Sequence, residues 1–241
     1  MSSPFLAGAV HLQGFSRSFH GKQVLHDLYL DVPPGQFVAL LGESGSGKTT
    51  LLRALAGLDA EAQSSGGAAA HGNVSVLFQD SRLLPWLSVL DNLTLGLDAQ
   101  EVRTAAGQLL REVGLADKAS VWPGTLSGWQ KQRAALARSL LREPHVLLAD
   151  EPFGALDALT RIRMHGLLRR MVDRIRPTVL LVTHDVDESL LLADRILVLK
   201  DGKIAEDHAV GLAHPRRPDH PAFMQLRATL LRSLGVETEF A

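Results

Sequence analysis

The chain has 241 residues, of which 46% are hydrophobic and 21% charged, a composition typical of a globular protein with one sizeable core or two small ones. Its net charge of −1 gives no general attraction to nucleic acid or anionic lipid, and we expect no nucleic-acid partner. The absence of cysteine excludes disulfides and thiolate metal sites, the longest apolar stretches are too short to span a bilayer, and the first residues lack the features of a signal peptide.

The N-terminal part of the chain predicts strands, a glycine-rich loop and a helix, in that order. Residues 10–31 carry alternating side chains and are expected to form edge strands. After a turn at 33–35, the apolar residues 36–41 predict a buried strand. The glycine-rich loop follows at 42–50, and the run 51–56 favours a helix.

The loop from Gly42 to Thr49 has the spacing G-x-x-x-x-G-K-T, which is typical of a loop that cradles phosphate groups. Its glycines allow positive φ angles, so successive backbone N–H groups can form a concave ring, and the following helix adds the positive end of its dipole. Lys48 can reach terminal phosphates, and Thr49 can offer its hydroxyl to Mg²⁺. The alternative is a glycine-rich turn that binds nothing, and the flanking strand and helix argue against it.

The middle of the chain predicts a helical insert. Small polar residues at 59–73 predict a loop, and 74–78 predict a strand that ends at Gln79. The apolar period then becomes helical over 89–113 and again over 128–141. Because no strand pattern lies between these positions, we interpret this section as a helical insert within an α/β core.

Buried strands and helices alternate in the next part of the chain. Short continuous apolar runs predict strands at 146–149, 178–182 and 194–199, and helices are expected at 158–175 and 186–193. Strands without alternation, separated by helices, indicate an α/β fold with a mostly parallel sheet covered on both faces.

The C-terminal segment predicts a linker and a short helix. Residues 206–221 are rich in Pro, His and Arg, and 222–234 have an amphipathic pattern. The histidines of the linker are not placed at metal-ligand spacing, so we expect them to be solvated.

Polar residues follow the ends of the predicted strands. Gln79, Asp150 and His184 each come at or after such an end, as does the glycine-rich loop. Because ligand sites of parallel sheets lie beyond the carboxyl ends of the strands, these groups are expected to converge. Asp150 would hold Mg²⁺, and Glu151 would accept a proton from an attacking water as general base. The alternative for two adjacent acids is a solvated turn, which their position at a strand end disfavours.

Ser127 lies at the start of the helix predicted from about 128. Gln130 follows three residues later, which is the spacing of a capping box. One interpretation is that the serine only caps its own helix. The other is that its hydroxyl and the free N-terminus of the helix form a second anion site.

Together these motifs resemble the ATPase subunit of ATP-binding cassette transporters, over roughly residues 10–205. In chain order, the resemblance assigns a Walker A loop to Gly42–Thr49, a Q-loop to Gln79, a signature to Leu126–Gln130, a Walker B strand to Val146–Asp150, a D-loop to Ala155–Asp157 and a switch histidine to His184. It also places Phe19 where the family has an aromatic ring that stacks on adenine, although by itself Phe19 could equally be a core residue.

The resemblance implies the fold and the site residues. The fold is a P-loop NTPase of the RecA-like type, with a parallel-sheet core, a small antiparallel β region and a helical insert. A single domain is expected over residues 1–241, with a core at about 1–79 and 142–205, a helical subdomain at about 80–141 and a tail at 206–241. The implied catalytic residues are Glu151, His184 and Gln79. The residues implied to contact ATP are Gly42, Glu43, Ser44, Gly45, Ser46, Gly47, Lys48, Thr49, Thr50, Phe19, Ser127, Gly128 and Asp157, and those implied to bind Mg²⁺ are Thr49, Gln79 and Asp150.

The resemblance also implies partners. Two copies would form a head-to-tail dimer with two ATP molecules at the interface, each held by the Walker A loop of one chain and the signature of the other. Further partners would be integral-membrane permease subunits and, indirectly, a periplasmic solute-binding protein. The chain would then be a peripheral protein at the cytoplasmic face of the bacterial inner membrane.

Within the family, the segments 82–86 and 154–161 resemble the nitrate, sulfonate and taurine importer group. The short connection before Gln79 and the tail at 215–217 are most similar to the ATPases of aliphatic sulfonate importers. A taurine or nitrate importer of the same group is one alternative. A soluble cassette ATPase not coupled to transport, or a nucleotide-binding regulator that does not hydrolyse ATP, is another.

Two features depart from the family pattern. The signature has Trp129 where the family has a second glycine, and a positive φ angle at that position would cost tryptophan about 1–2 kcal/mol. Only 31 residues separate Lys48 from Gln79, so the antiparallel β region is expected to be trimmed.

Overall fold

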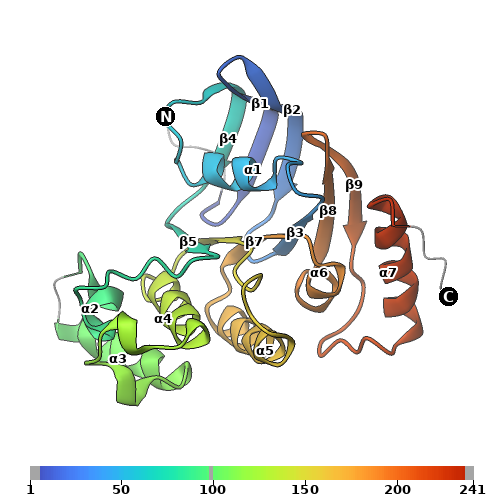
Figure 1. The fold of residues 1–241 in the computed structure, drawn as a ribbon. Helices are drawn as coiled ribbons and strands as arrows, with labels where there is room; N and C mark the ends of the chain where they lie inside the picture. Colours follow the sequence, from blue (N-terminus) through green and yellow to red (C-terminus); the bar gives the residue numbers. More distant parts are fainter. Residues whose placement is uncertain (1–5, 98–99, 237–241) are drawn as a thin grey trace.

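The computed structural model describes residues 6–97 and 100–236, and a six-stranded sheet lies at its centre (Figure 1). The strands have the order β5-β6-β7-β3-β8-β9. Their bounds are β3 Phe37–Leu41, β5 Val74–Phe78, β6 Val146–Asp150, β7 Thr178–Thr183, β8 Arg195–Lys200 and β9 Lys203–Ala209. The first five strands are parallel and β9 pairs antiparallel with β8, so the expected mostly parallel sheet is confirmed.

The central strands are buried on both faces, which explains why their sequences do not alternate. In β3, Phe37, Ala39 and Leu41 pack into one hydrophobic cluster, and Val38 and Leu40 pack into the other. The helix α1, Lys48–Leu55, covers one face together with the small antiparallel sheet, and α5, Ala158–Ile175, and α6, Val186–Leu192, cover the other (Figure 1). Burial from both sides favours continuous runs of Val, Leu and Ile in each strand.

A second, antiparallel sheet has the strand order β2-β1-β4. Its strands are β1 Val10–Phe19, β2 Lys22–Val32 and β4 Gln63–Ala70. The expected loop at 59–73 is therefore wrong for β4. The side chains of β4 are Gln, Ser, Gly and Ala and are mostly exposed, so the strand forms through backbone pairing with β1 rather than through side-chain burial. Such a strand carries no hydrophobic period.

The insert consists of α2 Val89–Thr94, α3 Gln100–Glu112 and α4 Gly128–Leu140, with two short 3₁₀ turns at 116–118 and 123–125. The helical period predicted over 89–113 is thus divided between two helices. Between residue 80 and residue 141, the described part of the chain contains helices and turns and no strand. None of the helices in the described ranges combines the length and the hydropathy needed to cross a membrane.

The C-terminal segment is part of the core. Residues 206–209, expected as linker, are the second half of β9, and the last helix, α7 Pro221–Ser233, packs beside α6 (Figure 1). Arg216 belongs to the segment that connects β9 to α7, and its side chain is 2% exposed. Its guanidinium donates hydrogen bonds to the carbonyl oxygens of Leu212, Leu190 and Ala193 at 2.9, 2.7 and 2.5 Å, so it closes the C-terminal end of α6.

We predict that Arg216→Met will lower the free energy of unfolding by about 3 kcal/mol, because it leaves buried carbonyl groups at the end of α6 without a donor. Urea denaturation followed by circular dichroism measures this. Arg217→Met is the matched control, since the Arg217 side chain is 75% exposed and pairs with nearby Asp219. Equal stability losses in the two variants would contradict the structural role of Arg216.

Candidate nucleotide site

Four neighbouring strands end at one edge of the parallel sheet, in the order β5-β6-β7-β3. The residues that follow them are Gln79 after β5, Glu151 after β6, His184 after β7 and the glycine-rich loop after β3. Adjacent strands lie about 4.8 Å apart, so parallel pairing alone brings these groups to one place. The convergence expected from the sequence is what the topology produces.

The glycine-rich loop packs so closely that two of its glycines cannot be replaced without rearrangement. A Cβ on Gly42 would lie 2.3 Å from the carbonyl oxygen of Leu199 and 2.8 Å from Ser46 Oγ. Gly47 has φ +102° and caps the N-terminus of α1, and a Cβ there would lie 2.7 Å from a methyl group of Leu25. The loop is therefore packed against β8 on one side and β2 on the other, and it leads directly into the N-terminus of α1.

Lys48 lies inside this loop and is 4% exposed. Its ammonium group donates hydrogen bonds to the carbonyl oxygens of Gly42 and Glu43 at 2.7 and 2.8 Å. Burial lowers the pKa of Lys48, while the charges of Glu151, Asp150 and Glu43 oppose that shift. The ammonium group is thus held inside the loop by two of its carbonyl oxygens, and a cation there can pair with phosphate oxygens.

Thr49 and Asp150 offer oxygen atoms to a metal ion. Thr49 Oγ1 donates a hydrogen bond to Asp150 Oδ1 at 2.9 Å, from the start of α1 to the end of β6. Burial raises the pKa of Asp150, and the hydrogen bond from Thr49 opposes the rise. No group of three or more His, Cys, Asp or Glu side chains that could hold a metal lies among the described residues. A hydroxyl and one carboxylate are a donor set that suits Mg²⁺ shared with phosphate oxygens and water, so the residues fit that ion.

Glu151 and His184 face each other across the site. Glu151 Oε2 lies 3.2 Å from His184 Nδ1, and the two side chains are 27% and 60% exposed. The backbone N–H of Glu151 donates to the carbonyl oxygen of Val182 at 3.0 Å, so pairing with β7 continues one residue beyond β6. Its φ angle of +43° then turns the chain away from the sheet. A non-glycine residue in this region carries strain of about 1–3 kcal/mol, a feature found at functional sites.

Gln79 lies on the same side as Glu151. A Cβ built on Gly154 would lie 3.2 Å from Gln79 Nε2 and 3.8 Å from Glu151 Oε2, so both side chains approach this glycine. A cleft of about 370 Å³ opens here, bordered by Gln79, Gly128 and Pro152 among others. The cleft joins the Q-loop to the N-terminal end of α4.

Ser127 caps α4 as its spacing predicted. Its Oγ accepts a hydrogen bond from the backbone N–H of Gln130 at 3.4 Å, and its own N–H donates to Gln130 Oε1 at 2.9 Å. Capping uses the hydroxyl only as an acceptor, so its proton remains free to donate elsewhere. Ser127 and Gly128 are exposed, and a Cβ on Gly128 would meet nothing within 4 Å. The two interpretations of this motif are therefore compatible.

Trp129 needs no special backbone conformation. It lies in the first turn of α4, and the non-glycine residues with positive φ do not include it. The guanidinium of Arg133, one turn further along α4, lies 3.3 Å from the centroid of the indole ring, in a cation–π contact. The indole therefore lies against the flank of its own helix, and the strain considered for this position is absent.

The family resemblance also implies that Asp157 and Phe19 contact ATP. Asp157 caps the N-terminus of α5, and hydrogen bonding to Thr160 lowers the pKa of its carboxyl group. Phe19 is half-buried at the end of β1, where it pairs with Lys22 of β2, the strand that contacts Gly47 further along. Arg17 lies 5.8 Å from the Phe19 ring centroid. Contact of either residue with a nucleotide stays a prediction.

Sequence reasoning missed Gln132. This residue is 3% exposed and lies on the buried face of α4, with Ala135 and Leu136 one turn further along. A glutamine at an apolar position of a predicted helix was the available signal, because a buried amide needs partners.

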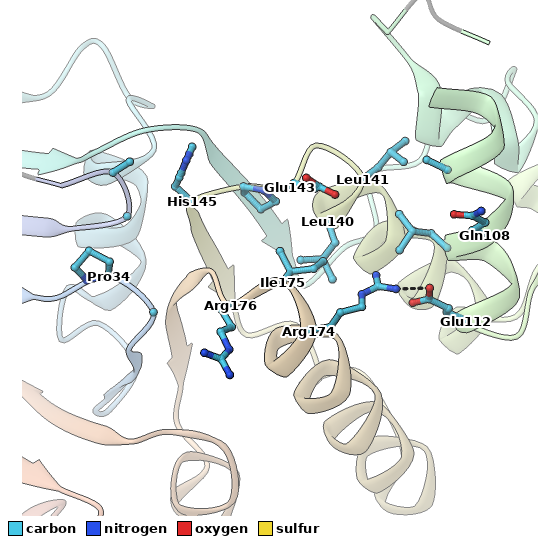
Figure 2. Close-up of a pocket in the computed structure, with 16 residues that line it drawn as sticks. Pro34, Gln108, Glu112, Leu140, Leu141, Glu143, His145, Arg174, Ile175 and Arg176 are labelled. Atoms are coloured by element: carbon cyan, nitrogen blue, oxygen red, sulfur yellow. Dashed lines mark hydrogen bonds and ion pairs between the residues drawn. The ribbon is translucent and has the colours of Figure 1, made fainter. Parts of the chain in front are cut away.

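A hollow of about 580 Å³ lies at the opposite edge of the sheet (Figure 2). Pro34, His145 and Arg176 line it, and these residues come before β3, β6 and β7. Figure 2 also shows the ion pair between Arg174 of α5 and Glu112 of α3, which joins the core to the insert. The hollow thus lies at the amino ends of the strands, away from the loop and the acids.

Comparisons with known proteins agree with this geometry. A profile of the ABC transporter family matches residues 25–154. The aliphatic sulfonates import ATP-binding protein SsuB of Delftia acidovorans is 88% identical over 240 residues, with 100% of both chains covered. SsuB 1 of Paracoccus denitrificans is 68% identical over 234 residues and 97% of each chain.

A solved structure of a dimeric ATP-binding cassette in a post-hydrolysis state, bound to ADP and phosphate, matches with a TM-score of 0.71 and 29% identity. The match covers 85% of this chain and 100% of that one. The sequence profile, the full-length relatives and the fold agree: the chain belongs to the ATP-binding cassette transporter family.

Proposed function

We propose that this chain is the ATP-hydrolysing, energy-coupling subunit of a bacterial importer for aliphatic sulfonates. The observation that carries the proposal is the 88% identity, over the full length of both chains, to an aliphatic sulfonates import ATP-binding protein. The strand-end site supplies the chemistry. Phosphoryl transfer needs positioned donors, a cation and a base, and all three lie on neighbouring strands.

Each residue of the site has a distinct role in hydrolysis. The loop and Lys48 would bind the β- and γ-phosphates, and Thr49 and Asp150, with Gln79, would hold Mg²⁺, which would neutralise charge on the phosphate oxygens. Glu151 Oε2 accepts the proton of the attacking water. His184, 3.2 Å from that oxygen, orients the carboxylate and contacts the γ-phosphate.

A complete site requires a second copy of the chain. Ser127 and Gly128 lie at an exposed helix N-terminus with an available hydroxyl proton, which suits an anion brought by another molecule. Two copies arranged head to tail would place this end of α4 over the loop of the partner. The dimeric state of the solved cassette supports this arrangement. ATP binding would then close the dimer and hydrolysis would reopen it.

The insert is the surface we assign to the permease subunits. Trp86 is 64% exposed just after the Q-loop, and Leu95 is 48% exposed at the end of α2. Exposed aromatic and aliphatic side chains of this size favour contact with a protein partner. The chain would dock from the cytoplasmic face of the inner membrane, and a periplasmic binding protein would reach it only through the permease. A taurine or nitrate importer of the same group remains the alternative, because selection of the transported anion would lie in those partners.

We predict that Glu151→Gln will bind ATP with near-normal affinity and hydrolyse it at least 100-fold more slowly. The change removes the proton acceptor and costs about 3 kcal/mol of barrier stabilisation, while the loop stays intact. Phosphate release and equilibrium binding of a fluorescent ATP analogue measure the two effects. Glu101→Gln, at an exposed position of α3, is the control. Normal turnover in Glu151→Gln would exclude this residue as the base.

We predict that Trp129→Gly will not raise the ATPase rate. The tryptophan already has helical backbone angles, and glycine in the first turn would remove the contact with Arg133 and lower helix stability by about 1 kcal/mol. Steady-state ATPase assays and thermal unfolding measure the two quantities. A several-fold gain in rate would show that the indole obstructs the half-site after all.

We predict that a strain lacking this chain will fail to grow on alkanesulfonates as sole sulfur source and will still grow on sulfate. Expression of the wild-type chain should restore growth, and the Lys48→Ala variant should not, because it lacks the phosphate-binding cation. If the strain instead grew on alkanesulfonates but failed to grow on taurine as sulfur source, or on nitrate as nitrogen source, the alternative substrate would be favoured.

A further inference from the structure

Gln132 joins three motifs through one side-chain amide. Its Nε2 donates a hydrogen bond to the carbonyl oxygen of Phe78 at 2.9 Å and another to the carbonyl oxygen of Pro152 at 2.8 Å. The residue is 3% exposed. Both hydrogens of the amide group are therefore used in hydrogen bonds. Water could not take over either bond without opening the core.

The two acceptors flank the hydrolysis residues. Phe78 immediately precedes Gln79, and Pro152 immediately follows Glu151. The donor lies in α4, little more than one turn beyond its capping residue Ser127. One amide thus ties the N-terminal end of α4 to the segments that carry Gln79 and Glu151.

A second side chain of α4 strengthens the contact with the Q-loop. Arg138 donates to the carbonyl oxygens of Ser81 and Arg82, both at 2.8 Å. The Q-loop is therefore bound to α4 on each side of Gln79. Arg138 makes no contact with the segment after Glu151 in these bonds, so the link to Pro152 depends on Gln132.

Two further side-chain links between insert and core lie away from this edge. Arg142 donates to the carbonyl oxygen of Leu95 at 2.9 Å, and Arg174 pairs with Glu112 beside the hollow at the opposite edge (Figure 2). Gln132 instead borders the cleft between Gln79 and Gly128. A displacement of α4 would thus be transmitted through Gln132 to the segments that carry Gln79 and Glu151.

We propose that Gln132 is a positioning residue that couples the signature helix to the hydrolysis residues of its own chain. The inference rests on the proposed function, in which Ser127 contacts the ATP bound by the partner while Gln79 and Glu151 act on the ATP of their own chain. Gln132 then connects the two ATP sites of the dimer. Closure of α4 on one nucleotide sets Gln79 and Glu151 around the other, because moving either alone would leave a buried donor unpaired.

Gln132→Met and Gln132→Glu test this coupling in the full-length chain. Both variants keep the length of the side chain and remove the two amide donors. Methionine ends in an apolar group and glutamate in a polar one, so if one variant fails to fold, the other can still be measured. Each is expected to lower kcat at least tenfold, to leave the Kd for ATP within twofold and to bring the Hill coefficient of ATP hydrolysis from above 1 to 1. Ser139→Ala is the matched control, because Ser139 is buried on the same helix and its hydroxyl donates to the carbonyl oxygen of Leu136 within that helix.

The outcomes separate this inference from the proposed function. A folded variant whose Hill coefficient stays at the wild-type value overturns the coupling role, whatever its kcat. A comparable loss of cooperativity in Ser139→Ala also overturns it, since any disturbance of α4 would then suffice. Absence of ATP hydrolysis in the wild-type chain, or absence of an ATP-dependent dimer in Glu151→Gln, would instead refute the proposed function itself.

Discussion

Parallel pairing of β5, β6, β7 and β3 is the constraint on which the site depends. Because their carboxyl ends meet at one edge, a loop, two acids, a glutamine and a histidine from distant parts of the chain come together. The strands are buried on both faces, and alternate residues of each strand pack into different hydrophobic clusters. A slip of one residue would turn each side chain toward the wrong cluster, so this packing fixes the register. The geometry of the site therefore depends on the apolar packing of these strands.

That packing also maintains local features that would be unfavourable alone. Lys48 is buried, and the carboxylates of Glu151 and Asp150 offset part of the cost of burying its charge. Glu151 has a positive φ angle and is fixed by its hydrogen bond to Val182 of β7. The strain and the buried charge lie next to each other at the ends of β6 and β3, where the proposed hydrolysis takes place.

The sequence predicted the elements whose side chains are buried. It missed strands that are held mainly by backbone hydrogen bonds to a neighbouring strand. The apolar runs of β3, β6 and β7 could be found because burial on two faces leaves a composition signal. β4 could not, since its Ser, Gly and Ala side chains are mostly exposed and the strand depends on pairing with β1. β9, expected as linker in its second half, alternates exposed and half-buried side chains at the edge of the sheet.

The candidate site shows the same division. Spacing identified the loop, the acids and the capping box, because each motif is local in sequence. The links made by Gln132 and Arg216 are long-range contacts of side chains with backbone carbonyls, and no local spacing identifies their partners. The conformation of Trp129 likewise follows from its contact with Arg133 rather than from the identity of the residue that usually stands there.

We propose that one chain holds halves of two different ATP sites. Sedimentation equilibrium of Glu151→Gln with Mg²⁺ and ATP tests it most directly, alone and combined with Ser127→Arg, which would block the exposed N-terminus of α4. We predict an ATP-dependent dimer with two bound nucleotides for Glu151→Gln, and a monomer that still binds one ATP when Ser127→Arg is added. A dimer that ignores Ser127→Arg, or a monomer in both cases, would contradict the account.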